Sequence, residues 1–212
     1  NQLSQQQGCS LFMTLLALFQ VLLYRYTGQR DIVVGSPIAN RHYKEIEGLI
    51  GFFVNTLALK TSFEGNETLL SVLQKVKETT LQAYQHQDIY FDQLVDYLDV
   101  PRVLNRNPVF QVEFSLDSSL NDTPHTLSGL TIQNIGTPLI VSKFDLRVGA
   151  FEYEEGINIS FDYATDLFEE EMIKRFAHNF AELIKAALKK PSQLLHDLSL
   201  LTSQEEHQLL IA

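Results

Sequence analysis

Hydrophobic and polar positions repeat with two different periods along this chain, and the alternation between them predicts a mixed α/β fold. Apolar residues at helical spacing predict helices over residues 11–26, 68–84, 91–98 and 167–190. Apolar runs and two-residue alternation predict strands over residues 31–38, 50–60, 109–117, 130–135, 144–153 and 157–163. Between these elements, residues 39–49 are expected to form a loop or a short irregular helix.

Residues of known capping preference mark the ends of several predicted elements. Gly28 supplies the left-handed residue that ends the first helix, and residues 154–156 join the last two strands as a hairpin. Asp166 is expected to cap the closing helix, and Pro191 ends it. The buried stripe of this helix is predicted to comprise Met172, Phe176, Phe180, Leu183 and Ala187.

Asn55 is an amide in an apolar row of the strand predicted over residues 50–60. Because side chains alternate across a strand, Asn55 shares its face with Phe53, Leu57 and Leu59. A buried amide without a partner costs about 1–3 kcal/mol, so it must bond to something. Two interpretations follow: a neighbouring backbone group satisfies Asn55, or Asn55 lines a cleft through which a substrate passes.

Other polar residues next to predicted elements have structural interpretations. His86 directly follows a helix and is expected to interact with its C-terminal dipole, with Gln87 in the turn beyond it. Asp88 is expected to cap the short helix over residues 91–98. Pro108, preceded by Arg106 and Asn107, is expected at the first strand position, where its missing N–H does no harm.

The strand over residues 109–117 has one apolar and one polar face. The polar face comprises Gln111, Glu113, Ser115 and Asp117. An ordinary solvated face is one interpretation of this pattern, and the border of a binding site is the other.

Composition narrows the class of protein. The 212 residues are 45% hydrophobic and 20% charged, as in a globular domain, and the net charge of −10 argues against general nucleic-acid binding. The apolar stretch over residues 11–26 is too short and too polar to span a membrane. The single cysteine, Cys9, fits a reducing compartment, so we expect a cytoplasmic protein. No residues have the spacing of metal ligands or of a nucleotide-binding loop, so no metal or directly bound cofactor is expected.

Five segments of the chain carry a resemblance to a known family. The main ones are IGFFVNTLALK at residues 50–60, HQDIYFD at 86–92 and NRNPVFQVEF at 105–114, supported by GSPIANR at 35–41 and DYATDLF at 162–168. In this order they resemble the condensation domains of nonribosomal peptide synthetases. The resemblance covers nearly the whole chain and implies a chloramphenicol-acetyltransferase-like lobe, a mixed sheet with packed helices.

In that family, an amide forms between aminoacyl or peptidyl thioesters carried on the phosphopantetheine arms of donor and acceptor carrier proteins. The family's catalytic signature is two adjacent histidines followed three residues later by Asp-Gly, and none of the six histidines here is adjacent to another. The resemblance therefore implies a C-terminal lobe over residues 1–191, catalytically silent by itself, and a connector over 192–212 toward an adenylation domain. The N-terminal lobe of the same domain would be its first partner.

The resemblance also implies roles for particular residues. Asn55, Arg41, Gln111 and Ser115 would border the substrate channel or the interface between lobes, with Ser115 nearest the acceptor side. Residues 118–143 would form an arm that reaches the other lobe.

Two alternatives to a condensation lobe stay open. One is a lobe of an epimerisation domain or a related acyltransferase, although the NPVFQV stretch favours condensation. The other is a non-catalytic module that docks carrier proteins.

Overall fold

The computed structural model describes residues 1–101, 103–104, 106–118, 141–153, 156–202, 204–205 and 207–208. Its strands are β1 (Asp31–Ile38), β2 (Asn55–Ser62), β3 (Val112–Ser118), β4 (Leu146–Tyr153) and β5 (Gly156–Tyr163). Its longer helices are α2 (Leu11–Thr27), α4 (Leu69–Gln85), α5 (Phe91–Tyr97) and α6 (Glu170–Lys189). Short helical turns are α1 (Gln2–Gln6), α3 (Lys44–Glu47) and η1 (Leu195–Asp197).

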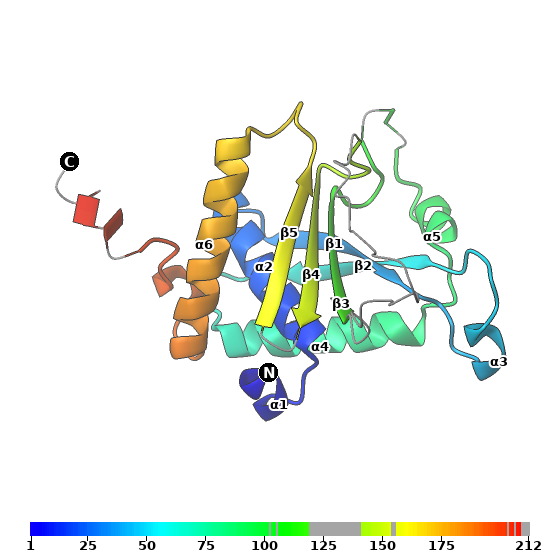
Figure 1. Ribbon diagram of the computed structural model, residues 1–212, viewed down its shortest axis with the longest axis horizontal. Helices are drawn as coiled ribbons and strands as arrows, with labels where there is room; N and C mark the ends of the chain where they lie inside the picture. Colours follow the sequence, from blue (N-terminus) through cyan, green and yellow to red (C-terminus); the bar gives the residue numbers. More distant parts are fainter. Residues whose placement is uncertain are drawn as a thin grey trace, which may run out of the picture.

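The five strands form one mixed sheet in the order β2-β1-β3-β4-β5, which confirms the predicted α/β class (Figure 1). β1 is antiparallel to β2 and parallel to β3, whereas β4 is parallel to β3 and antiparallel to β5. Helix α6 runs beside β5, and α3 and α5 lie at the opposite end of the molecule, beyond β2 (Figure 1).

Helices α2, α4 and α6 cover one face of the sheet with a single hydrophobic core. The Phe19 ring of α2 lies at its centre, 5.6 Å from the ring of Phe114 on β3 and 5.9 Å from that of Phe180 on α6. Gln20 is fully buried there, and its amide donates to Leu59 O and accepts from Thr61 Oγ1 on β2. Helix α2 is thus a buried helix, and none of the described helices is long and apolar enough to cross a membrane.

Several predicted boundaries are corrected by the structure. The strand expected over residues 50–60 begins only at Asn55, and the strand expected from Val109 begins at Val112. Phe110 N–H donates to Pro108 O and closes a three-residue turn around Val109, whose φ is 69°, so Pro108 lies before the strand and not at its first position. The predicted strand over 130–135 and most of the predicted arm lie outside the described residues.

The closing helix also differs from the prediction. Helix α6 begins after Glu169 without a side-chain cap, so Asp166 does not cap it. Ile173 replaces Met172 in the buried stripe, since Met172 is exposed while Phe176, Phe180, Leu183 and Ala187 are buried as predicted. The described part of the predicted connector packs on the lobe: Leu195 and Leu198 are buried, and Arg25 of α2 donates to both of their carbonyls.

Gly35 of β1 is required by a close approach of an aromatic ring. A Cβ atom at this position would lie 2.1 Å from the Phe110 ring, whereas one at Gly48 would meet nothing within 4 Å. Phe110 also lies 5.2 Å from the Phe91 ring and 5.6 Å from the Phe144 ring, measured between centroids. The ring therefore joins β1 to α5 and to the segment before β4.

We expect Gly35→Ala to lower the free energy of unfolding by about 1–3 kcal/mol, because the Phe110 ring and its aromatic neighbours must shift. Gly48→Ala, at an exposed glycine, should change it by less than about 0.5 kcal/mol. Chemical denaturation of both variants measures the difference. Equal stability of the two variants would contradict the close packing at Gly35.

Candidate functional site: a pocket on the open face of the sheet

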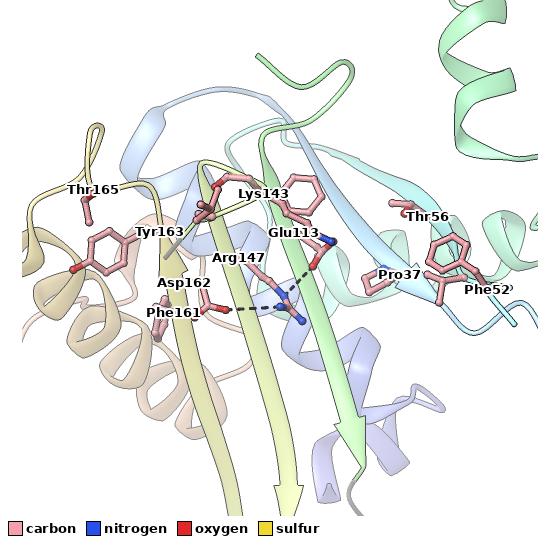
Figure 2. A pocket seen from close by; sticks show the side chains of 14 residues that line it. Pro37, Phe52, Thr56, Glu113, Lys143, Arg147, Phe161, Asp162, Tyr163 and Thr165 are labelled. Carbon is pink, nitrogen blue, oxygen red and sulfur yellow. Dashed lines mark hydrogen bonds and ion pairs between the residues drawn. The ribbon is translucent and has the colours of Figure 1, made fainter. Parts of the chain in front are cut away.

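The sheet face opposite the helices carries a row of charged residues. Glu113 of β3 pairs with Arg147 of β4, and Arg147 pairs with Asp162 of β5. Paired residues on neighbouring strands share a face, so the three side chains lie side by side. Arg147 Nε lies 3.0 Å from Glu113 Oε1, and Arg147 Nη1 lies 3.9 Å from Asp162 Oδ2 (Figure 2).

This row forms part of the lining of a pocket of about 710 Å³ (Figure 2). The volume is within the range of about 300–1,000 Å³ that is typical of ligand sites. Most of the remaining lining is apolar or weakly polar: Pro37, Phe52, Val54, Thr56, Val141, Ser142, Phe144, Phe161, Tyr163 and Thr165. Among the described residues, the other charged residue of the lining is Lys143.

Glu113 is the buried charge of the pocket, with 7% of its surface exposed. Burial raises the pKa of the Glu113 carboxyl above its ordinary value, against the opposing influence of the Arg147 and Lys143 charges. The Arg147 Nε–H has no well-aligned acceptor among the described residues, so its contact with Glu113 is an ion pair with poor hydrogen-bond geometry. The solvated interpretation of the polar β3 face is therefore wrong at Glu113.

Ser115 lies one pleat further along the same face of β3 and is also 7% exposed. Its hydroxyl has no hydrogen-bond partner among the described residues. It pairs with Gly149 of β4, which in turn pairs with Ser160 of β5, so a row of small residues adjoins the charged row. Ser115 is buried, like Glu113, and does not itself line the pocket.

Asn55 is satisfied entirely by backbone groups. Its Nδ2 donates to Gln87 O at 2.9 Å and to Ile89 O at 2.8 Å, and its Oδ1 accepts from the N–H groups of Phe91 and Thr56. All four hydrogen-bonding positions of the amide are thus filled, and 4% of the residue is exposed. Asn55 does not line the pocket, but its neighbours Val54 and Thr56 do.

The HQD segment at residues 86–88 supplies this backbone. His86 ends α4 as its C-terminal cap, as predicted, and the carbonyl of Gln87 accepts from Asn55. The cap predicted from Asp88 is wrong: α5 begins after Tyr90, and the Asp88 carboxylate instead lies 3.6 Å from the His42 ring on the surface. Because Asn55 Oδ1 accepts from Phe91 N–H, it is Asn55 that holds the start of α5.

Arg41 organises the loop before β2. Its guanidinium donates to the carbonyls of Ile46, Glu47 and Gly51 and lies 4.2 Å from the centroid of the Phe53 ring. These contacts are internal to the loop, and they present Phe52 to the pocket with 90% of its surface exposed.

The RNP segment at residues 106–108 organises the opposite wall. Asn107 Nδ2 donates to Lys143 O at 3.0 Å, and Gln111 Nε2 donates to Asn107 O at 2.9 Å. Arg106 donates to Gln111 Oε1 at 3.4 Å. The segment over residues 141–144, which lines the pocket, is therefore fixed through Asn107.

The sequence pattern did not single out Arg147 and Asp162. The predicted hairpin could have indicated this pair, because its register places Arg147 directly opposite Asp162. Among the described residues, no cluster of three or more His, Cys, Asp or Glu side chains could hold a metal ion.

A family model described as the condensation domain matches residues 1–210, and the chain therefore belongs to the condensation-domain family. It is 45% identical over 210 residues to one of the proteins that make up the linear gramicidin synthase of Brevibacillus parabrevis, covering 98% of this chain and 3% of that protein. It is 41% identical over 210 residues to bacitracin synthase 3 of Bacillus licheniformis, covering 99% of this chain and 3% of that protein. The chain thus spans a few per cent of the length of these relatives.

Solved structures show the same fold. The X-domain from teicoplanin biosynthesis superposes with a TM-score of 0.86 at 24% identity, over 94% of this chain and 46% of that chain. The first condensation domain of the calcium-dependent antibiotic synthetase, in complex with a substrate analogue, gives 0.70 at 16% identity, over 94% of this chain and 43% of that chain. The chain therefore corresponds in length to somewhat less than half of such a domain.

We expect Asn55→Asp to lower the free energy of unfolding by at least about 2 kcal/mol at neutral pH, because an anionic oxygen would face the carbonyls of Gln87 and Ile89. The loss should shrink in acid, where a protonated Asp carries one donor. Asn158→Asp, at an exposed position of β5, is the matched control. Denaturation curves at several pH values measure both, and a loss that did not exceed that of the control would contradict the role of the four hydrogen bonds.

A second expectation concerns the buried charge of Glu113. A carboxyl with a raised pKa in the folded state takes up protons on folding, so the native chain should lose stability relative to Glu113→Gln as the pH rises from about 4 to 8. Urea denaturation across this range measures the difference. The prediction would be contradicted if the stability difference between the two proteins did not change with pH, or if the native chain became relatively more stable as the pH rose. Either result would show that burial does not raise the pKa of Glu113.

Proposed function

We propose that this chain is the C-terminal lobe of a condensation domain and forms one wall of the channel in which a nonribosomal peptide synthetase makes amide bonds. The observation that carries this proposal is the family match over residues 1–210, together with peptide-synthase relatives that are above 40% identical over nearly the whole chain. The pocket on the sheet face opposite the helices is the channel wall in this proposal. The substrates are aminoacyl or peptidyl thioesters, carried on the phosphopantetheine of donor and acceptor carrier proteins.

The chemistry asks for positioning more than for strong acid or base catalysis. A neutral amine is already a nucleophile, and its attack on the thioester carbonyl forms the C–N bond while the C–S bond breaks and the thiol leaves with a proton. This lobe contributes shape and polarity: Phe52, Val54 and Phe144 offer apolar contacts, and Glu113 with Arg147 fixes a charged floor.

Several residues of the family segments hold the pocket lining in place through hydrogen bonds and do not themselves line the pocket. Asn55 and the HQD backbone hold Val54 and Thr56, Arg41 holds the loop with Phe52, and Asn107 with Gln111 holds residues 141–144. Ser115, which is buried two residues beyond Glu113 on the same face of β3 and does not itself line the pocket, marks the acceptor side of the wall in this proposal. The reactive histidine pair would come from the N-terminal lobe, and residues 192–212 would lead toward an adenylation domain.

The test is a chimera in which this chain replaces the matching residues of a condensation domain in bacitracin synthase 3. We expect the chimera to form the dipeptide from loaded carrier proteins, and we expect this chain alone to give no product above buffer. A chimera whose histidine pair is changed to alanine is the control for catalysis by the other lobe.

Three outcomes would contradict the proposal. Turnover by the isolated chain would show that it holds its own reactive group. A folded chimera that releases only an inverted aminoacyl group would favour an epimerisation lobe, and one that binds carrier proteins without making product would favour a docking module.

A further inference from the structure

The charged side chains of the pocket form one row that crosses β5, β4 and β3. Along the row, Asp162, Arg147 and Glu113 alternate in sign, and the row ends at an acid. Beyond Glu113 its partner on β1 is Gly35, which is covered by the apolar Phe110 ring, and the lining residues on that side, Pro37 and Thr56, are uncharged. Within the described sheet, Glu113 therefore has a cation beside it on β4 and none on β1.

The hydrogen-bonding capacity of Glu113 is also incompletely used. A carboxylate offers about four acceptor positions. Arg147 is the cation within ion-pair distance among the described residues, and its Nε–H is poorly aligned with Glu113 Oε1. A carboxylate that is only 7% exposed and so weakly satisfied is costly unless a donor completes it.

We propose that Glu113 binds a primary ammonium group of the acceptor substrate, with Arg147 and Asp162 as positioning residues. This proposal rests on the proposed function. A donor with a positive charge that enters from the pocket supplies Glu113 with a second cation, and the apolar lining offers contacts for the rest of an aminoacyl group. An anionic ligand fits less well, because both cations of the lining, Arg147 and Lys143, already act on Glu113.

The charged groups around Glu113 give the expected pH dependence. They are Arg147 on β4, Asp162 on β5 and Lys143 in the segment before β4, while β1 and β2 present Pro37 and Thr56. Burial raises the pKa of Glu113, so the carboxylate that binds ammonium is lost as the pH falls through that raised pKa. Affinity for the amine should therefore fall in mildly acidic solution.

Direct titration of this chain tests the proposal without any turnover. Three probes separate the sources of the amine: L-leucine N-methylamide has an α-amine, N-acetyl-L-ornithine N-methylamide has a side-chain amine, and N-acetyl-L-leucine N-methylamide has neither. The side-chain carboxyl carbons of ¹³C-labelled glutamate are observed by NMR, and the Glu113 signal is assigned by its absence in Glu113→Gln.

We expect one of the two amines to shift the Glu113 signal saturably, and the probe without an amine to leave it unchanged. Calorimetric titration, which does not depend on the Glu113 signal, should show that Glu113→Gln weakens the binding of that amine about tenfold or more, which corresponds to about 1.4 kcal/mol. Glu113→Asp should retain part of the binding. Asp117→Asn, an exposed acid on the same face of β3, should bind as the native chain does.

The proposal is overturned if neither amine shifts the signal, if the amine-free probe does so equally, or if binding survives in Glu113→Gln. Should Glu113→Gln fail to fold, the Glu113 signal is assigned by its absence in Glu113→Asp, and calorimetric titration of the three probes into the native chain and into Glu113→Asp still decides the matter. An inactive chimera with intact amine binding would count against the proposed function alone.

Discussion

The whole arrangement depends on a sheet whose main hydrophobic core lies on the face that the helices cover. Three helices and the core around Phe19 occupy that face, so the inward row of every strand must be apolar or fully hydrogen-bonded. Strand alternation then sends the intervening residues of β3, β4 and β5 to the opposite face. Glu113, Arg147 and Asp162 lie together there because the registers of three strands bring them into one row.

The shape of the pocket walls comes from residues that do not face the pocket. Asn55 commits its amide to four backbone groups, and Asn107 and Arg41 bind carbonyls of the segments that line the pocket. The residues that line the pocket are their neighbours, such as Thr56 and Phe52. A side chain locked into the fold is a poor ligand for a substrate, but it fixes its neighbours within the tolerance that positioning requires.

Much of this fold could be predicted from the sequence, because the spacing of apolar residues in long helices such as α2 and α6 shows which face is buried. The burial of Asn55 followed from alternation, but three of its four partners did not, since they lie more than 30 residues away in a segment whose path depends on the packing of α5. The start of β3 was missed because a turn around Val109, with positive φ, interrupts an apolar run. The Glu113–Arg147 pair required the parallel register of β3 and β4, which no local pattern encodes.

The central claim is that the sheet face opposite the helices is a substrate wall, and site-directed labelling in the active chimera tests it most directly. Thr56→Cys lies in the pocket, Lys60→Cys lies on the same face of β2 outside it, and Cys9→Ala removes the native thiol. The account predicts that a carrier protein loaded with a non-hydrolysable aminoacyl-pantetheine slows maleimide labelling at position 56 and leaves the rate at position 60 unchanged. Equal protection at both positions, or none at position 56, would contradict it.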